Sequence, residues 1–135
     1  MLQTIFKRSL STKPSSSAVG ALLGTVVERS DADFKQTLAL AGSTPVVVDF
    51  YADWCGPCRM LAPILKKSIQ TQQPTPKTFL VKVNVDEAVK TAAEYGIASL
   101  PTVGVFRDGA LVETFVGLRN EEFVKQFVEK HTASA

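Results

Sequence analysis

Two cysteines three positions apart, Cys55 and Cys58, are the residues of this sequence best suited to chemistry. Thiols at this spacing can close into a disulfide and open again, so the pair can exchange two electrons with another dithiol. A closed zinc site needs two further ligands, which a lone C-x-x-C pair does not supply. The single histidine, His131, lies near the C-terminus, where we expect a mobile, solvated side chain and not a ligand or general base. We therefore predict a redox pair and no metal site.

The elements around the pair favour a reactive first thiol. Residues 46–51 are rich in β-branched side chains and predict a buried strand, and the residues after the first cysteine predict a helix that carries Leu61 and Leu65 on one face. A thiol at the first turn of a helix faces unpaired N–H groups and the positive end of the helix dipole, which favour the thiolate. We predict that Cys55 attacks and that Cys58, one turn further in, resolves the mixed disulfide. Inert packing of two buried cysteines is the alternative.

The rest of the chain predicts one α/β domain. Its 135 residues, 45% of them hydrophobic, suit a single compact core. Strand-like and helical segments alternate beyond residue 27. They are a helix capped by Asp31, a strand at 79–85, a helix at 86–95 with Val89 facing inward, a hairpin of strands 103–106 and 111–116 around an Asp-Gly turn, and a closing helix with Phe123 and Phe127. We expect residues 28–135 to form a mixed sheet, parallel units followed by an antiparallel hairpin, with helices on both faces.

The charge distribution argues against a nucleic-acid surface. The net charge is +2, but Lys7, Arg8 and Lys13 precede the first acidic residue, Glu28, which leaves 12 basic against 13 acidic residues in the expected domain. A nearly neutral domain lacks the basic footprint with which proteins neutralise phosphates. We expect no nucleic-acid partner.

The first 27 residues have the composition of an organellar import signal. They contain no acidic residue, three basic ones and many hydroxyls, and Leu2, Ile5 and Phe6 fall on one side of a helical projection. Residues 8–11 resemble the cleavage pattern of mitochondrial presequences, with a cut before Ser11. We predict a transit peptide over residues 1–27 and a location in the mitochondrial matrix, with the cytoplasm as the alternative.

Two other hypotheses for the first 27 residues stay open. In the first hypothesis, the apolar residues 18–27 are the core of a secretory signal, although no small-x-small cleavage site follows them. In the second, the 27 residues are a disordered extension without a targeting role. Ten apolar residues are too few for a membrane helix, which needs about 20, so we expect no membrane anchor.

The eleven residues from Val48 to Cys58, VDFYADWCGPC, closely resemble the active-site segment of the thioredoxin family, whose order of elements residues 26–128 also follow. The resemblance implies a thioredoxin fold and a protein-disulfide reductase that needs no cofactor beyond its own Cys55–Cys58 disulfide. The Gly56-Pro57 dipeptide between the cysteines goes with the reducing members of the superfamily. The alternatives are a thiol oxidase or isomerase, and an interaction module of the same fold that binds partners without its cysteines.

The resemblance also assigns roles to residues outside the pair. It makes Asp49 the buried acid, with a raised pKa, that helps to deprotonate Cys58, whereas its own position also fits an edge-strand aspartate facing solvent. It suggests that Lys82 pairs with Asp49 and tunes it, whereas a solvated side chain is the alternative. Leu100-Pro101-Thr102 resembles the cis-proline loop that faces the cysteines, and a trans proline that opens a strand is the alternative.

By the same resemblance, an apolar surface around the Cys55 sulfur docks client proteins. We expect Trp54, Leu100, Gly117 and Leu118 to bind substrate, supported by Gly56, Pro57 and Pro101. Tyr51 stands where the family often has a tryptophan, so packing there is expected to differ. The implied partners are a flavoprotein thioredoxin reductase and disulfide clients such as peroxiredoxins, and we expect a monomer that supports cell redox homeostasis.

Overall fold

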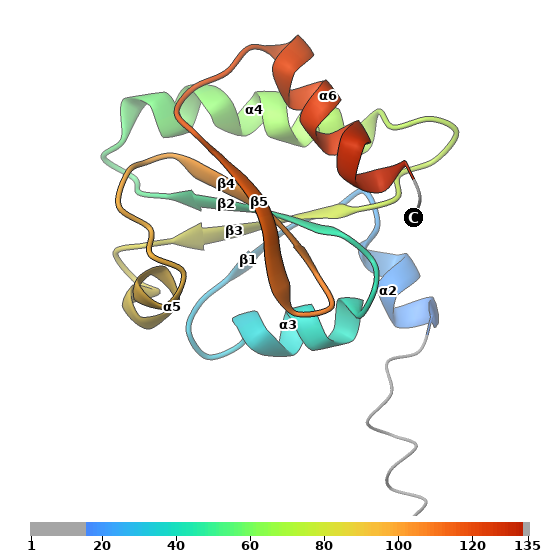
Figure 1. The fold of residues 1–135 in the computed structure, drawn as a ribbon, viewed down its shortest axis with the longest axis horizontal. Helices are drawn as coiled ribbons and strands as arrows, with labels where there is room; N and C mark the ends of the chain where they lie inside the picture. The colour runs from blue at the N-terminus through green and yellow to red at the C-terminus, as the bar shows by residue number, and fades with distance from the viewer. Residues whose placement is uncertain (1–15, 134–135) are drawn as a thin grey trace, which may run out of the picture.

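The computed structural model describes residues 16–133, which form a five-stranded sheet covered by helices on both faces (Figure 1). The strand order is β1-β3-β2-β4-β5. The strands are β1 (Val26–Arg29), β2 (Val46–Tyr51), β3 (Phe79–Asn84), β4 (Thr102–Arg107) and β5 (Ala110–Val116). Strand β3 pairs in parallel with β1 and β2, whereas β4 runs antiparallel to both β2 and β5. The expected mixed sheet is confirmed.

The helices divide between the two faces (Figure 1). Helices α4 (Gly56–Gln70) and α6 (Glu121–Thr132) cover one face, and α2 (Ser16–Leu22), α3 (Phe34–Ala41) and α5 (Val89–Glu94) lie on the other. Successive side chains of a strand point to opposite faces. In β2, Val48 and Phe50 therefore pack in the core with α3, whereas Val47 packs with α4 and α6. Asp49 shares the face of Val47 and so points toward α4.

The predicted hairpin is confirmed. Strands β4 and β5 are joined through Asp108 and Gly109, whose φ angles are 53° and 78°. Two successive residues with positive φ make the type of two-residue turn whose twist matches a hairpin, and Asp-Gly is a preferred sequence for it.

Helices α3 and α5 differ from the prediction. Helix α3 begins after Asp33 and not after Asp31, whose carboxylate instead accepts hydrogen bonds from the Thr91 N–H (2.8 Å), the Thr91 hydroxyl (2.7 Å) and the Lys90 N–H (3.2 Å). Asp31 thus holds the start of α5. This helix is shorter than predicted, and Val89 is 61% exposed because Thr91 is the residue that α5 buries.

Elements of the described chain already occur before the boundary expected at residue 28. Strand β1 starts at Val26, and Leu22, the last residue of α2, packs with Leu23 against the core on the α3 face. The Gly24 N–H donates to the Thr78 carbonyl at 2.9 Å, which ties this segment to the residues that lead into β3. The predicted cut before Ser11 lies outside the described residues.

Candidate functional site

Cys55 and Cys58 form a disulfide at the start of α4. Cys55 is the N-cap residue of the helix, with extended backbone angles (φ −88°, ψ 109°), and its Sγ accepts a hydrogen bond from the Cys58 N–H at 3.2 Å. An unpaired amide at the first turn thus points at the Cys55 sulfur, as the sequence predicted. When the disulfide is reduced, the same amide and the helix dipole favour a Cys55 thiolate. Pro57 lies in the first turn, where a missing N–H costs nothing.

The two sulfur-bearing residues line different hollows of the surface. Cys55 is 5% exposed and Cys58 is 2% exposed. Cys55 lines an open groove of about 470 Å³, whereas Cys58 lines a smaller hollow of about 210 Å³ shared with Tyr51 and Lys82. The groove therefore gives access to Cys55, and the smaller hollow gives access to Cys58.

The groove beside Cys55 contains some, but not all, of the substrate-binding residues expected from the sequence. Its lining consists of Trp54, Cys55, Gly56, Pro57, Val85, Ile97, Ala98 and Leu100. The expectation missed Val85, Ile97 and Ala98. The last two lie just before Ser99 and the proline loop, and their apolar character is the signal that could have included them.

Pro101, Gly117 and Leu118 lie outside that lining. The Leu100–Pro101 peptide bond is cis, and Pro101 is buried. The Gly117 N–H donates to the Pro101 carbonyl at 2.9 Å, and Leu118 is 40% exposed next to it. Gly117 has a φ of 92°, a conformation that glycine adopts without a steric penalty. The structure therefore links Gly117 to the proline loop without placing it in the groove.

Trp54 forms an exposed wall of the groove. Its side chain is 69% exposed, and the indole Nε1 donates to Asp86 Oδ2 at 2.9 Å. This bond orients a large, mostly exposed apolar ring. An ordered aromatic surface next to a reactive sulfur suits contact with another protein chain.

Asp49 is fully buried in the central strand β2, which overturns the alternative of an edge-strand aspartate facing solvent. Neither carboxylate oxygen has a hydrogen-bond partner among the described residues. Burial raises the pKa of Asp49 to about 7, with Lys82 opposing this change and Glu28 adding to it. A carboxyl group with a pKa in this range can accept and release a proton at neutral pH.

Lys82 lies beside Asp49 in the sheet but does not form the expected pair with it. The two residues are register partners in β3 and β2. The Lys82 Nζ lies 4.3 Å from the centre of the Tyr51 ring, and it makes no hydrogen bond to the Asp49 carboxylate. The Tyr51 hydroxyl donates to Glu28 Oε2 at 2.6 Å. The sequence drew attention to Tyr51 only for its packing and missed Glu28 entirely.

His131 is held in α6 and is not a mobile terminal residue. Its side chain is only 10% exposed, its Nε2 lies 2.7 Å from Glu113 Oε1, and its ring packs beside Phe127. It links α6 to β5, because α6 continues almost to the end of the chain. Among residues 16–133, no three His, Cys, Asp or Glu side chains cluster closely enough to hold a metal ion.

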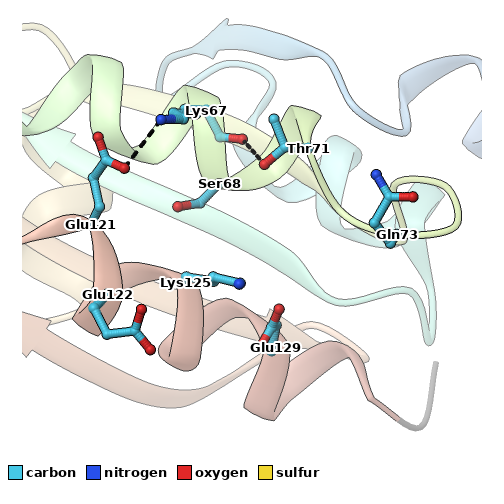
Figure 2. Close-up of a pocket in the computed structure, with 8 residues that line it drawn as sticks. All are labelled: Lys67, Ser68, Thr71, Gln73, Glu121, Glu122, Lys125 and Glu129. Atoms are coloured by element: carbon cyan, nitrogen blue, oxygen red, sulfur yellow. Dashed lines mark hydrogen bonds and ion pairs between the residues drawn. The ribbon is translucent and has the colours of Figure 1, made fainter.

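A second groove lies between the C-terminal half of α4 and the helix α6 (Figure 2). Lys67 and Glu121 form an ion pair across it at 3.2 Å, and Lys125 points into it from α6. The pair is more than half exposed on both sides, so it contributes little to binding or stability. The groove contains no cysteine, and Lys67 is nine residues beyond Cys58, about 13 Å along the helix. We therefore place the functional site at the cysteine pair.

None of the helices described between residues 16 and 133 is long and apolar enough to cross a membrane.

Comparisons with known proteins identify the family of the chain. The family model described as Thioredoxin matches residues 25–130. Thioredoxin 1 of Synechococcus elongatus is 45% identical over 102 residues, covering 76% of this chain and 92% of that protein. The mitochondrial thioredoxin of Mus musculus is 39% identical over 95 residues, 70% of this chain and 56% of that protein. The reduced thioredoxin pre-protein of Schistosoma mansoni, a solved structure, superposes with a TM-score of 0.71 at 32% identity, covering 79% of this chain and 98% of that one.

Proposed function

Because the chain belongs to the thioredoxin family of protein-disulfide oxidoreductases, we propose a division of labour in which Cys55 attacks, Cys58 resolves and Asp49 handles the proton. The observation that carries this proposal is the placement of the two cysteines. The Cys58 amide points at the Cys55 sulfur, and the two residues line different hollows. The reductase activity follows from the family, and the roles of the individual residues are the proposal.

The first step joins the protein to its client. In the reduced protein the Cys55 thiolate attacks one sulfur of a client disulfide. A new S–S bond forms between Cys55 and the client while the client's own S–S bond breaks, and its second sulfur leaves as a thiolate. The N–H at the start of α4 stabilises the attacking thiolate before this step.

The second step releases the client. Asp49, on the α4-facing side of β2, accepts the proton of Cys58, directly or through solvent in the hollow beside Lys82. The Cys58 thiolate then attacks the Cys55 sulfur, the mixed disulfide breaks, and the client's remaining sulfur leaves as a thiolate. Two electrons have passed to the client, the proton on Asp49 returns to solvent or to a departing thiolate, and the Cys55–Cys58 disulfide of the structure is formed.

We propose that clients bind as extended segments along the groove beside Cys55. Trp54 and Leu100 provide apolar surface on either side of the sulfur, and Pro57 completes it. Gly117 and Leu118 are expected to contact longer segments from beyond the proline loop. A shallow apolar groove of this kind suits protein segments of varied sequence and does not enclose a small molecule.

The proposed partners are a flavoprotein thioredoxin reductase, which returns two electrons to the disulfide, and client proteins such as peroxiredoxins. The protein would act as a monomer. A dithiol that supplies electrons must have a sufficiently low potential, and equilibrium with glutathione tests this property. A potential near the −270 mV of thioredoxin supports a reductase, whereas about −180 mV indicates an isomerase.

We further propose that an import signal within residues 1–27 sends the protein to the mitochondrial matrix. The support is its composition and the similarity to a mitochondrial relative from Mus musculus, although bacterial thioredoxins match as well. A cut before Ser11 would leave α2 on the mature domain. Mass spectrometry of the N-terminus of the endogenous protein tests both the cut and its place, and an uncut N-terminus would contradict the proposal.

Insulin reduction coupled to thioredoxin reductase tests the function as a whole, because it requires the nucleophile, the resolving thiol and the electron supply together. We expect turnover with the unmodified protein and none with Cys55→Ser. Binding of a client that survives the loss of both cysteines, together with no turnover of the unmodified protein, would instead support an interaction module.

A further inference from the structure

Three charged residues form a row across neighbouring strands beneath α4. Glu28 of β1 is the register partner of Lys82 in β3, which is in turn the register partner of Asp49 in β2. Register partners in a sheet present their side chains on the same face, here the face covered by α4. The row therefore runs from an exposed carboxylate, through an ammonium, to a buried carboxyl group.

Tyr51 connects this row at its outer end. It lies two residues after Asp49 in β2 and so shares its face. The Tyr51 hydroxyl donates to Glu28 Oε2 at 2.6 Å, and the Lys82 Nζ lies 4.3 Å from the centre of its ring. Burial raises the pKa of Tyr51, and the bond to Glu28 raises it further, so the hydroxyl remains a donor throughout the neutral range. The ammonium thus rests on a ring that Glu28 holds in place.

Resting on the proposed function, we propose that Glu28 and Tyr51 are positioning residues for the proton step: they hold the Lys82 ammonium over the Tyr51 ring and away from Asp49, which leaves the buried carboxylate free to take the proton of Cys58. A direct Lys82–Asp49 ion pair would stabilise the carboxylate as an anion and make it a weaker base. The structure has no such pair, because neither Asp49 oxygen has a hydrogen-bond partner among the described residues.

The charges around Asp49 agree with this arrangement. Burial is the main cause of its raised pKa of about 7, Lys82 acts in the opposite direction, and Glu28 acts in the same direction as burial. From α4, Cys58 and Arg59 line the hollow together with Asp53 of the preceding loop, and from β4 the register partner of Asp49 is the apolar Val103. Glu87 also acts on Tyr51 through its charge but makes no hydrogen bond to it.

The test is the titration of the Asp49 carboxyl group in the oxidised protein, followed by NMR of the carboxyl carbon. Glu28→Gln keeps a hydrogen-bond acceptor and removes the charge, and Tyr51→Phe keeps the ring and removes the bond. Both should move the midpoint to lower pH. Glu28 and Asp49 are two strand spacings apart, about 10 Å, for which Coulomb's law gives several tenths of a pH unit to about one unit for Glu28→Gln. Raising the salt concentration should shrink that difference, because Glu28 is exposed.

Repeating Tyr51→Phe in a Lys82→Gln protein separates a positioning role of Tyr51 from a merely structural one. That protein has no ammonium at residue 82 that could move toward Asp49, so Tyr51→Phe should no longer shift the Asp49 midpoint. Glu87→Gln, which removes a nearby exposed charge without touching the Tyr51 hydroxyl, is the matched control and should leave the midpoint in place. The inference would be overturned if neither Glu28→Gln nor Tyr51→Phe moved the Asp49 midpoint. It would also be overturned if Tyr51→Phe moved the midpoint equally with and without Lys82, or if Glu87→Gln moved it as much as Glu28→Gln does.

A kinetic measurement extends the test to the reaction. The pH profile for client release from the mixed disulfide should move in the same direction as the Asp49 midpoint in Glu28→Gln protein. The titration uses no client, so its result is independent of the insulin assay. Midpoints that shift as expected in a protein that fails to reduce insulin would support the placement of Lys82 by Glu28 and Tyr51 but reject the function, whereas normal reduction with unmoved midpoints would reject the inference alone.

Discussion

Replacing Asp49 with asparagine should make the oxidised protein more stable, by an amount that grows with pH. The side chain is fully buried, and neither oxygen has a hydrogen-bond partner among residues 16–133. Ionising such a group in the folded protein is unfavourable, whereas in the unfolded chain it is not. Asparagine has nearly the same shape and no charge, so it removes this cost while leaving the packing of β2 in place.

The size of the effect follows from the pKa of Asp49, which burial raises from 3.8 to about 7 in the folded state. Between these two values the folded protein binds one more proton than the unfolded chain, so the free energy of unfolding falls as pH rises. A difference of roughly three pH units at 1.36 kcal/mol each amounts to about 4 kcal/mol. The penalty is absent below pH 4, develops up to pH 7, and is constant above that.

Urea unfolding of the oxidised protein between pH 4 and pH 8 measures this penalty. The quantity of interest is the difference in unfolding free energy between Asp49→Asn and the unmodified protein, because all other titrating groups cancel in it. The difference should be small at pH 4 and should grow by about 4 kcal/mol by pH 8. Using the oxidised form keeps the cysteines from titrating.

Asp53→Asn provides a matched control, since Asp53 lies in the loop just beyond β2 and its side chain is exposed. It should show no comparable growth with pH. If the Asp49→Asn difference were the same at every pH, or fell as pH rose, the buried carboxyl group would not carry the charge-burial cost assigned to it and its role as a base at neutral pH would lose its basis.

Three further substitutions test other parts of the structure. Leu61→Ala removes a fully buried side chain between α4 and the sheet and should lower the unfolding free energy by about 2–5 kcal/mol in urea titrations; a loss well under 1 kcal/mol would contradict its place in the core. Asn120→Ala removes the side-chain oxygen that accepts from the Phe123 N–H at 2.9 Å and should cost about 1 kcal/mol, most of which Asn120→Ser should restore. Cys58→Ser should accumulate a mixed disulfide between Cys55 and the client that intact-mass spectrometry detects, and Cys55→Ser should not; trapping by both variants would reject the assigned order of attack.

The parts of the fold that could be predicted from sequence are those whose signals are local. Residues 46–70 form one continuous stretch in which a β-branched run, the cysteine pair and an amphipathic helix follow one another, and all three were recognised. The hairpin at Asp108 and Gly109 was equally clear, since two-residue turns of this type have strong preferences of their own.

The parts that could not be predicted depend on pairing between distant segments. Strand β1 offers only four residues, and its place beside β3 comes from a long-range parallel pairing. The contact of Glu28 with Tyr51 joins residues 23 positions apart, and that of Asp31 with Thr91 joins residues 60 apart. Likewise, the sequence left open whether Asp49 faced solvent, because burial of a strand depends on which strands flank it.

The position of β2 also bears on how the protein opens. The strand that leads into Cys55 has β3 on one side and β4 on the other, whereas β1 and β5 are the border strands of the sheet that residues 16–133 form. Amide hydrogens of an inner strand typically exchange only when the whole domain unfolds, and those of border strands exchange through smaller local openings. Fraying of β1 or β5 therefore leaves β2, and with it the backbone that leads into Cys55, hydrogen-bonded on both sides.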